Sequence, residues 1–92
     1  MGFTKESAVD AAKKDLAQRL NVSENDIKVS GTAEADFPDM SLGAPENGEM
    51  SAQMISSGWK INLDADGKTY EYRGDKYQLR LKDFEGTNYK IG

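Results

Sequence analysis

The spacing of apolar residues changes at Ile27, and this change constrains the fold more than any other feature of the chain. Before Ile27, apolar residues recur every three or four positions, as on one face of a helix: Val9, Ala12, Leu16 and Leu20. From Ile27 onward they alternate with polar residues, which is typical of strands with one buried face. The sequence therefore predicts an α+β fold, with one N-terminal amphipathic helix packed on a four- to five-stranded antiparallel sheet.

The expected helix spans residues 4–20. Thr4 is suited to cap its N-terminus, and Asn21 tolerates the left-handed backbone that often ends a helix. The segment Ser23–Asp26 then predicts a single capped turn that leads into Ile27.

The expected strands follow one another as a meander. In the first, Ile27, Val29, Gly31, Ala33 and Ala35 alternate with polar residues, and Gly31 indicates a bulge or close packing beneath the helix. We expect the next strand at 50–55, followed by a turn at 56–58. The remaining pattern predicts strands at 59–65, 70–72, 77–82 and 88–91, with turns at Asp66-Gly67 and Gly74-Asp75.

Residues 37–49 break all periodicity. Both prolines and two of the nine glycines of the chain lie in this stretch, which predicts a loop. Irregular connections of about 13 residues are uncommon and are often functional. Its candidate binding residues are Phe37, Pro38, Asp39, Met40, Ser41, Leu42, Gly43 and Pro45. The alternative is that Met40 and Leu42 simply cap the core.

Composition limits the chemistry open to the chain. Its 92 residues form one domain, 1–92, with no cysteine and no histidine. Disulfides, thiolate nucleophiles, imidazole bases and ordinary zinc sites are thereby excluded. Catalysis would rest on carboxylates near the ends of the loop, such as Asp39 and Glu49, without an apolar pocket to raise a pKa. We therefore expect no enzyme, no cofactor and no metal.

The net charge of −4, with acidic and basic residues interleaved, limits the partners. No basic stripe is present to neutralise phosphates, so nucleic acid and anionic membrane surfaces are disfavoured. No apolar run is long enough to span a bilayer. We expect a monomer whose partner is a protein or a peptide.

Three short sequence patterns resemble functional motifs but also have an ordinary structural interpretation. Residues 64–67 resemble the start of a calcium loop, but Lys68 and Thr69 stand where a ligand and a glycine belong, which favours a hairpin turn. Arg73–Asp75 is the tripeptide that integrins read on exposed loops, although its position between two strands predicts an ordinary turn. Asn21–Ser23 satisfies the weak glycosylation pattern.

Several segments together resemble a known family of small domains in bacterial and archaeal secreted proteins and lipoproteins. They are Asp15–Leu20, Phe37–Pro45, Gly58–Leu63 and Tyr70–Tyr72, within a match from about residue 8 to 75. The family hallmark is an aromatic-Pro-Asp-x-Ser-Leu-Gly loop, so the loop block is the most specific part. The resemblance implies an extracytoplasmic or secreted location.

Two departures from that family pattern bear on function. Ala44 stands where a cysteine often follows Leu-Gly, and Arg73 stands where a histidine often follows Tyr-x-Tyr. Since side chains capable of chemistry are missing at both positions, the resemblance favours a binding or structural role.

Three functions follow from these observations. The first is a non-catalytic protein- or peptide-binding module acting through residues 37–49, with Phe37, Met40 and Leu42 as apolar contacts and prolines that reduce the entropy lost on docking. The second is a proteinase inhibitor that presents residues 39–43 in extended form to an active-site cleft. The third is a purely structural accessory domain in which the same apolar residues point inward. Burial of the loop side chains distinguishes them.

Overall fold

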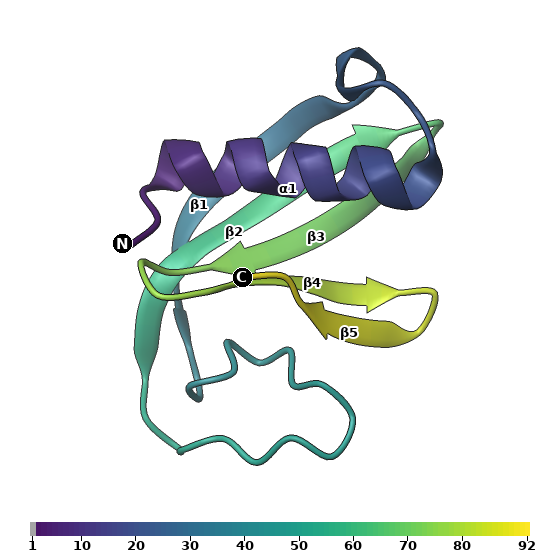
Figure 1. The fold of residues 1–92 in the computed structure, drawn as a ribbon. Helices are drawn as coiled ribbons and strands as arrows, with labels where there is room; N and C mark the ends of the chain where they lie inside the picture. The colour runs from purple at the N-terminus through teal and green to yellow at the C-terminus, as the bar shows by residue number, and fades with distance from the viewer. Residues whose placement is uncertain (1) are drawn as a thin grey trace.

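A helix and a five-stranded antiparallel sheet make up the computed structural model, which describes residues 2–92 (Figure 1). The strands are paired in the order in which they occur along the chain, as a meander. The predicted α+β class and N-terminal helix are therefore confirmed. In chain order the elements are α1 (Lys5–Leu20), the 3₁₀ turn η1 (Glu24–Asp26), β1 (Lys28–Phe37), β2 (Ser56–Ala65), β3 (Lys68–Gly74), β4 (Leu79–Phe84) and β5 (Thr87–Lys90).

Local capping sets both ends of α1. The backbone N–H of Ser7 donates to Thr4 Oγ1 at 3.1 Å, and that of Thr4 donates to Ser7 Oγ at 2.9 Å. This reciprocal pair satisfies amides that have no partner inside the helix. At the other end, Asn21 adopts φ 56°, the left-handed conformation that terminates a helix. Ser23 then caps η1, so the predicted turn is also confirmed.

The main core lies between α1 and the inner strands of the sheet. Its fully buried large side chains come from both layers: Leu16, Ile61, Leu63, Tyr72, Leu79 and Leu81. Tyr72 joins the layers, because its hydroxyl donates to Asp15 Oδ2 at 2.7 Å. Arg19 Nε donates to the same oxygen at 2.7 Å. Burial, followed by the nearby Asp15 carboxylate, raises the pKa of the Tyr72 hydroxyl.

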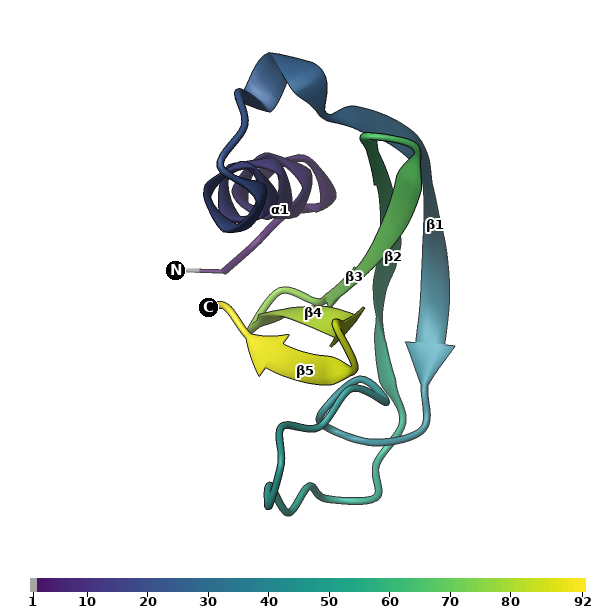
Figure 2. The same ribbon diagram turned by 90° about the vertical axis from the view of Figure 1, so that its right-hand side faces the viewer.

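Strand β1 lies at the edge of the sheet, beyond the reach of α1 (Figure 2). Val29 and Ala33, which the alternation placed in the core, are exposed, and this prediction was wrong. The physical reason is that α1 packs against β2, β3 and β4, leaving nothing to cover β1. The bulge predicted at Gly31 is confirmed, because the pairing register shifts between Val29 and Gly31.

The predicted turns after β2 and β3 are present. Asp66 and Gly67 have φ of 52° and 78°, as a tight hairpin between β2 and β3 requires. After β3, the Asp75 carboxylate accepts hydrogen bonds from the amides of Tyr77 and Gln78. This turn delays β4 to Leu79, so the strand predicted from residue 77 begins two residues later. Tyr77 is left 75% exposed.

The predicted strand at 50–55 is wrong. This segment is irregular, and the predicted turn at 56–58 lies inside β2. The spacing of Met50, Met54 and Ile55 imitates a strand, but β1 ends at Phe37, which pairs with Ser56. No neighbouring strand is therefore left for residues 50–55, and their apolar side chains are exposed. The connection between β1 and β2 consequently spans residues 38–55.

Candidate functional site

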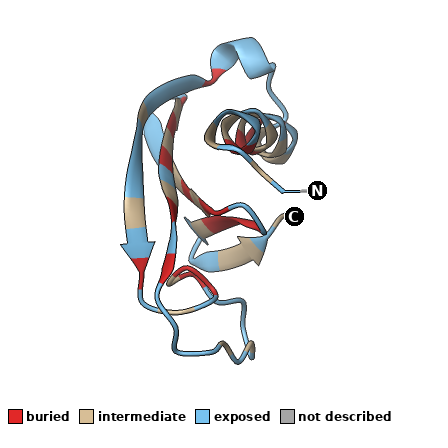
Figure 3. Cartoon of the chain, turned by 90° about the vertical axis from the view of Figure 1, so that its left-hand side faces the viewer, coloured by how far each residue is buried: buried red, intermediate tan, exposed pale blue. Residues whose placement is uncertain are grey.

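The connection between β1 and β2 folds over the sheet face opposite α1, so that β4 and β5 lie between the helix and the loop (Figures 1 and 2). Three predicted site residues, Phe37, Ser41 and Leu42, are buried there. Figure 3 shows buried segments in the loop as well as beneath the helix. Of the other predicted site residues, Asp39 and Gly43 are partly exposed, and the exposed ones are Pro38, Met40 and Pro45. The loop thus has a buried side and an outer side.

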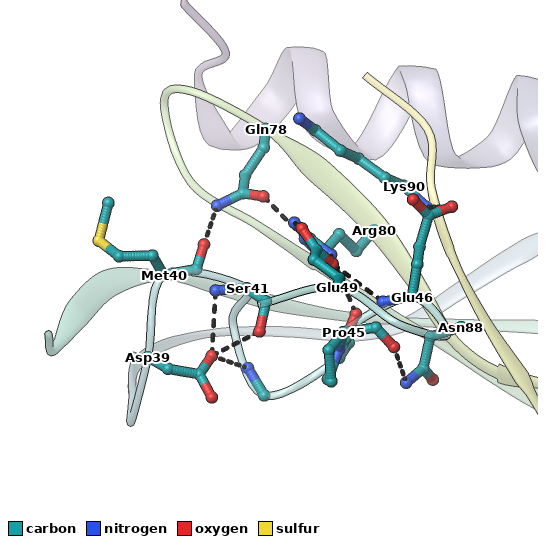
Figure 4. Close-up of polar contacts among 12 residues, drawn as sticks. Asp39, Met40, Ser41, Pro45, Glu46, Glu49, Gln78, Arg80, Asn88 and Lys90 are labelled. Atoms are coloured by element: carbon teal, nitrogen blue, oxygen red, sulfur yellow. Dashed lines mark hydrogen bonds and ion pairs between the residues drawn. The ribbon is translucent and has the colours of Figure 1, made fainter. Parts of the chain in front are cut away.

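Asp39 organises the first turn of the loop. Its Oδ1 accepts hydrogen bonds from the Gly43 amide at 3.0 Å, the Ser41 hydroxyl at 2.7 Å and the Ser41 amide at 3.0 Å (Figure 4). The bond from Gly43, and then that from the Ser41 hydroxyl, hold the pKa of Asp39 below its usual range. Asp39 and Ser41 therefore satisfy each other within the turn.

Residues 39–43 do not form an extended segment. Leu42 and Gly43 have φ of 60° and 66°, in the left-handed region. A Cβ on Gly43 would lie 2.6 Å from Arg73 Nη1, so a larger residue here would displace the arginine. A substrate-like loop enters a proteinase cleft in extended form, and this geometry does not favour that role.

Side chains from the sheet satisfy the backbone of the loop. Gln78 and Arg80 alternate with Leu79 and Leu81 in the strand predicted at 77–82, a pattern that predicts solvent-facing side chains, yet both are buried. That prediction was wrong because the loop covers this face. Three alternate carbonyls accept hydrogen bonds, so the buried backbone keeps its partners. The pairs are Gln78 Nε2 to Met40 O at 2.6 Å, Arg73 Nη1 to Leu42 O at 2.9 Å and Arg80 Nη1 to Ala44 O at 3.2 Å.

Arg80 also holds the far end of the loop through Glu49. Its Nη1 and Nη2 lie 2.6 and 2.7 Å from the two carboxylate oxygens, and its Nε donates to Gln78 Oε1 at 2.7 Å. The Arg80 side chain is 3% exposed and that of Glu49 is 27% exposed. Hydrogen bonding from Arg80, and then from the Glu46 amide, lowers the pKa of Glu49 to about 2. The pair binds the loop to β4.

The Arg73–Asp75 tripeptide is not displayed for recognition. Arg73 lies under the loop, where its Nε donates to Glu71 Oε2 at 2.6 Å and its guanidinium carbon is 5.3 Å from the centre of the Phe37 ring. Asp75 is buried and accepts hydrogen bonds from its own turn. The tripeptide therefore serves the sheet and the turn.

The hairpin interpretation of residues 64–67 also fits the structure. Thr69 Oγ1 donates to Asp64 Oδ1 at 2.7 Å, which closes the hairpin across β2 and β3. Within residues 2–92, no three carboxylates gather as metal ligands would. Nor is any helix in this range long and apolar enough to cross a membrane.

Exposed apolar side chains gather where the outer side of the loop meets the start of β2. Three of them, Met40, Ile55 and Tyr77, line a hollow of about 390 Å³ together with the half-buried Trp59, and we call these four residues the outer patch. Ile55 is 76% exposed, Tyr77 75% and Met40 41%. Exposed apolar residues that gather in this way mark interaction surfaces more often than scattered ones do.

Sequence reasoning missed most of the outer patch. Met40 was a predicted site residue, but Ile55, Trp59 and Tyr77 were assigned to the strands predicted at 50–55, 59–65 and 77–82. One sequence signal could have indicated the exposure of Tyr77. The turn predicted at Gly74-Asp75 lies only two residues before Tyr77, and in the structure the Tyr77 amide belongs to that turn and β4 begins at Leu79.

A second hollow, of about 1060 Å³, lies at the opposite end of the sheet beside the C-terminus of α1. Its apolar lining residues Leu20, Tyr70 and Phe84 pack against the main core. Around them stand both acidic and basic side chains, including Asp26, Asp83 and Lys68, so this surface resembles ordinary solvated protein. The outer patch is the better candidate site.

The geometry defines a small α+β module whose sheet is covered by a helix on one face and by a hydrogen-bonded loop on the other. The chain belongs to the family described as a domain of unknown function (DUF8738), whose model matches residues 9–82. The matched range contains the whole loop and the outer patch. No curated protein and no solved structure matches the chain.

Proposed function

We propose that this domain is a non-catalytic module that binds a protein or peptide through the outer patch. The observation that carries the proposal is the exposure of Ile55, Tyr77 and Met40 around one hollow, whereas Phe37 and Leu42 are buried. Tryptophan, tyrosine and methionine are enriched at protein interfaces, and an aromatic anchor often supplies much of the binding energy.

The loop supports this function by holding the patch in place. The Met40 amide donates to Ala52 O at 3.0 Å, and its carbonyl accepts from Gln78 Nε2 at 2.6 Å. Ser56 Oγ lies 3.3 Å from the Met40 sulfur. Because these contacts order the backbone before any partner arrives, little conformational entropy is lost on docking.

A purely structural accessory role is the second candidate. Burial of Phe37 and Leu42 favours it, since side chains that are buried in the fold are not available to a partner. A structural role does not explain why Ile55 and Tyr77 are exposed beside one hollow, and for this reason binding is the first proposal. The proteinase-inhibitor alternative is less well supported, because Ser41 and Leu42 within residues 39–43 are buried.

We also propose an extracytoplasmic location, which rests on the resemblance of the loop block to secreted domains. Cell fractionation of the native protein with an antibody to the domain tests it. Recovery in the exported or envelope fraction supports the proposal, and recovery only with cytosolic markers contradicts it.

Site-specific photo-cross-linking in the native cells tests the binding function. A photoreactive phenylalanine analogue replaces Ile55 in one variant and Val29, an exposed residue of β1 outside the patch, in the control. We expect a discrete cross-linked product from position 55 that disappears when Tyr77→Ser is added. Equal labelling from both positions, or none from either, would favour the structural role.

A further inference from the structure

The hollow of the outer patch also contains an acidic side chain. Glu34 lines it, and the β1–β2 register places Glu34 directly opposite Trp59. Side chains opposite each other in an antiparallel pair share one face, with Cβ atoms about 4.5–5.5 Å apart. Within residues 2–92, no ion pair engages the Glu34 carboxylate, and the residue is exposed. A carboxylate therefore stands beside an indole ring at the edge of the hollow.

An ammonium group of the chain already lies against the other aromatic ring of the patch. Lys76 Nζ is 5.4 Å from the centre of the Tyr77 ring, within the range of a cation–π interaction. The lining of the hollow thus includes two aromatic side chains, the Lys76 ammonium on the Tyr77 side and, on the Trp59 side, the Glu34 carboxylate without an ion pair in the described part of the chain. Aromatic faces and a carboxylate are the groups that bind a cation, and apolar neighbours favour the aliphatic stem that carries it.

We propose that the hollow receives a lysine or arginine side chain of the partner, flanked in the partner sequence by apolar residues. Its cation lies between the Glu34 carboxylate and the Trp59 ring, and the apolar flanks cover Ile55 and Tyr77. This inference rests on the proposed binding function and specifies the chemistry of the partner.

Charge favours such a partner over a second copy of the chain. Each copy carries a net charge of −4, so two copies repel each other at long range. A basic segment of a partner instead carries charge opposite to that of the chain, and its cation can pair with the Glu34 carboxylate.

Tryptophan fluorescence tests the inference, because Trp59 is the single tryptophan of the chain. Three blocked peptides serve as probes: Leu-Lys-Leu-Lys-Leu, its form acetylated on both Nζ atoms, and Leu-Glu-Leu-Glu-Leu. We expect a saturable change in Trp59 emission with the lysine peptide and binding at least about fivefold weaker with the acetylated form. The glutamate peptide should not bind.

Variants separate the cation contact from general apolar binding. Glu34→Gln should weaken the lysine peptide about fivefold to tenfold and leave the acetylated peptide unchanged. The matched control Glu24→Gln alters an exposed acid in η1, outside the hollow, and should change neither affinity. Circular dichroism spectra that match wild type keep the comparison free of folding effects.

The contrary outcomes are distinct. Equal affinity for the lysine and acetylated peptides, unaffected by Glu34→Gln, overturns the cation inference and leaves the proposed binding function in place. The absence of saturable binding by any peptide also overturns it, and photo-cross-linking at position 55 then decides the binding function separately. Sedimentation that shows a dimer lost on Tyr77→Ser would instead assign the patch to a second copy.

Discussion

Glu49→Gln tests whether the loop is held by its ion pair with the sheet. The substitution keeps the shape of the side chain but removes its charge, so the buried Arg80 loses its charged partner and keeps only neutral acceptors, among them Ala44 O and Gln78 Oε1. Removing one partner of a buried ion pair costs about 3–5 kcal/mol. Because the Glu49 side chain is 27% exposed, water compensates part of this loss. We expect the free energy of unfolding to fall by about 2 kcal/mol.

The pH dependence of this difference follows from the depressed pKa of Glu49. Its pKa is about 2 in the folded chain, against a usual value of 4.5. A depressed pKa stabilises the fold above the unfolded value, and this stabilisation disappears as the pH falls through the folded value. The difference between these two pKa values corresponds to a stabilisation of at most about 3.4 kcal/mol, which solvent screening reduces toward about 2 kcal/mol. The gap between wild type and variant should therefore be full near pH 7, shrink below pH 4.5 and close near pH 2.

Urea unfolding followed by circular dichroism measures this gap at several pH values. Near neutral pH, the expected loss corresponds to a fall in Tm of about 8–16 °C for a domain of this size. Glu85→Gln, in the exposed β4–β5 turn, is the matched control and should change stability by less than about 0.5 kcal/mol. A Glu49→Gln variant as stable as the control, or a gap that does not change with pH, would refute the reasoning.

Two further predictions concern stability, and a third concerns the ionisation of Tyr72. Asp39→Asn should lower the free energy of unfolding by about 1–3 kcal/mol in urea titrations, because three donors lose a charged acceptor; an unchanged midpoint would contradict the role of Asp39 in the turn. Leu42→Ala should cost about 2–5 kcal/mol and Met40→Ala less than about 1 kcal/mol by thermal unfolding, since only Leu42 is fully buried; similar losses would show that the loop has no buried side. Because burial raises its pKa, the hydroxyl of Tyr72 should stay protonated in the folded chain, so ultraviolet titration of Tyr72→Phe should match wild type until unfolding.

Local signals predicted those parts of the fold that local interactions determine. Thr4 and Asn21 bound the helix, and Asp66-Gly67 forms its hairpin, because each acts through its own backbone within a few residues. The strand predicted at 50–55 failed for a different reason. Apolar alternation indicates a strand only where a neighbouring strand exists to pair with it, and that condition depends on where β1 ends.

The sequence predicted an irregular loop after the first strand, but it left open which of the loop side chains are buried. The sequence marks Asp39 and Ser41 as polar, yet these side chains satisfy each other inside the turn. Burial of Arg80 depends on the loop folding across β4, a contact between residues far apart in the chain. The outer patch likewise joins Met40 and Ile55 of the loop with Trp59 of β2 and Tyr77 of the turn after β3, and no pattern within a single segment reveals their convergence.

Amide hydrogen exchange in the loop tests the central claim most directly, namely that residues 39–44 are a held structural turn whose outer side alone is available to a partner. The amides of Met40, Ser41, Leu42, Gly43 and Ala44 each donate a hydrogen bond. We predict that Ser41 and Gly43 exchange at least about a hundredfold more slowly than an unstructured chain, because opening must break bonds worth several kcal/mol together. In Asp39→Asn this protection should fall at both amides. Exchange of Ser41 and Gly43 at the unstructured rate in the wild-type domain would contradict the account.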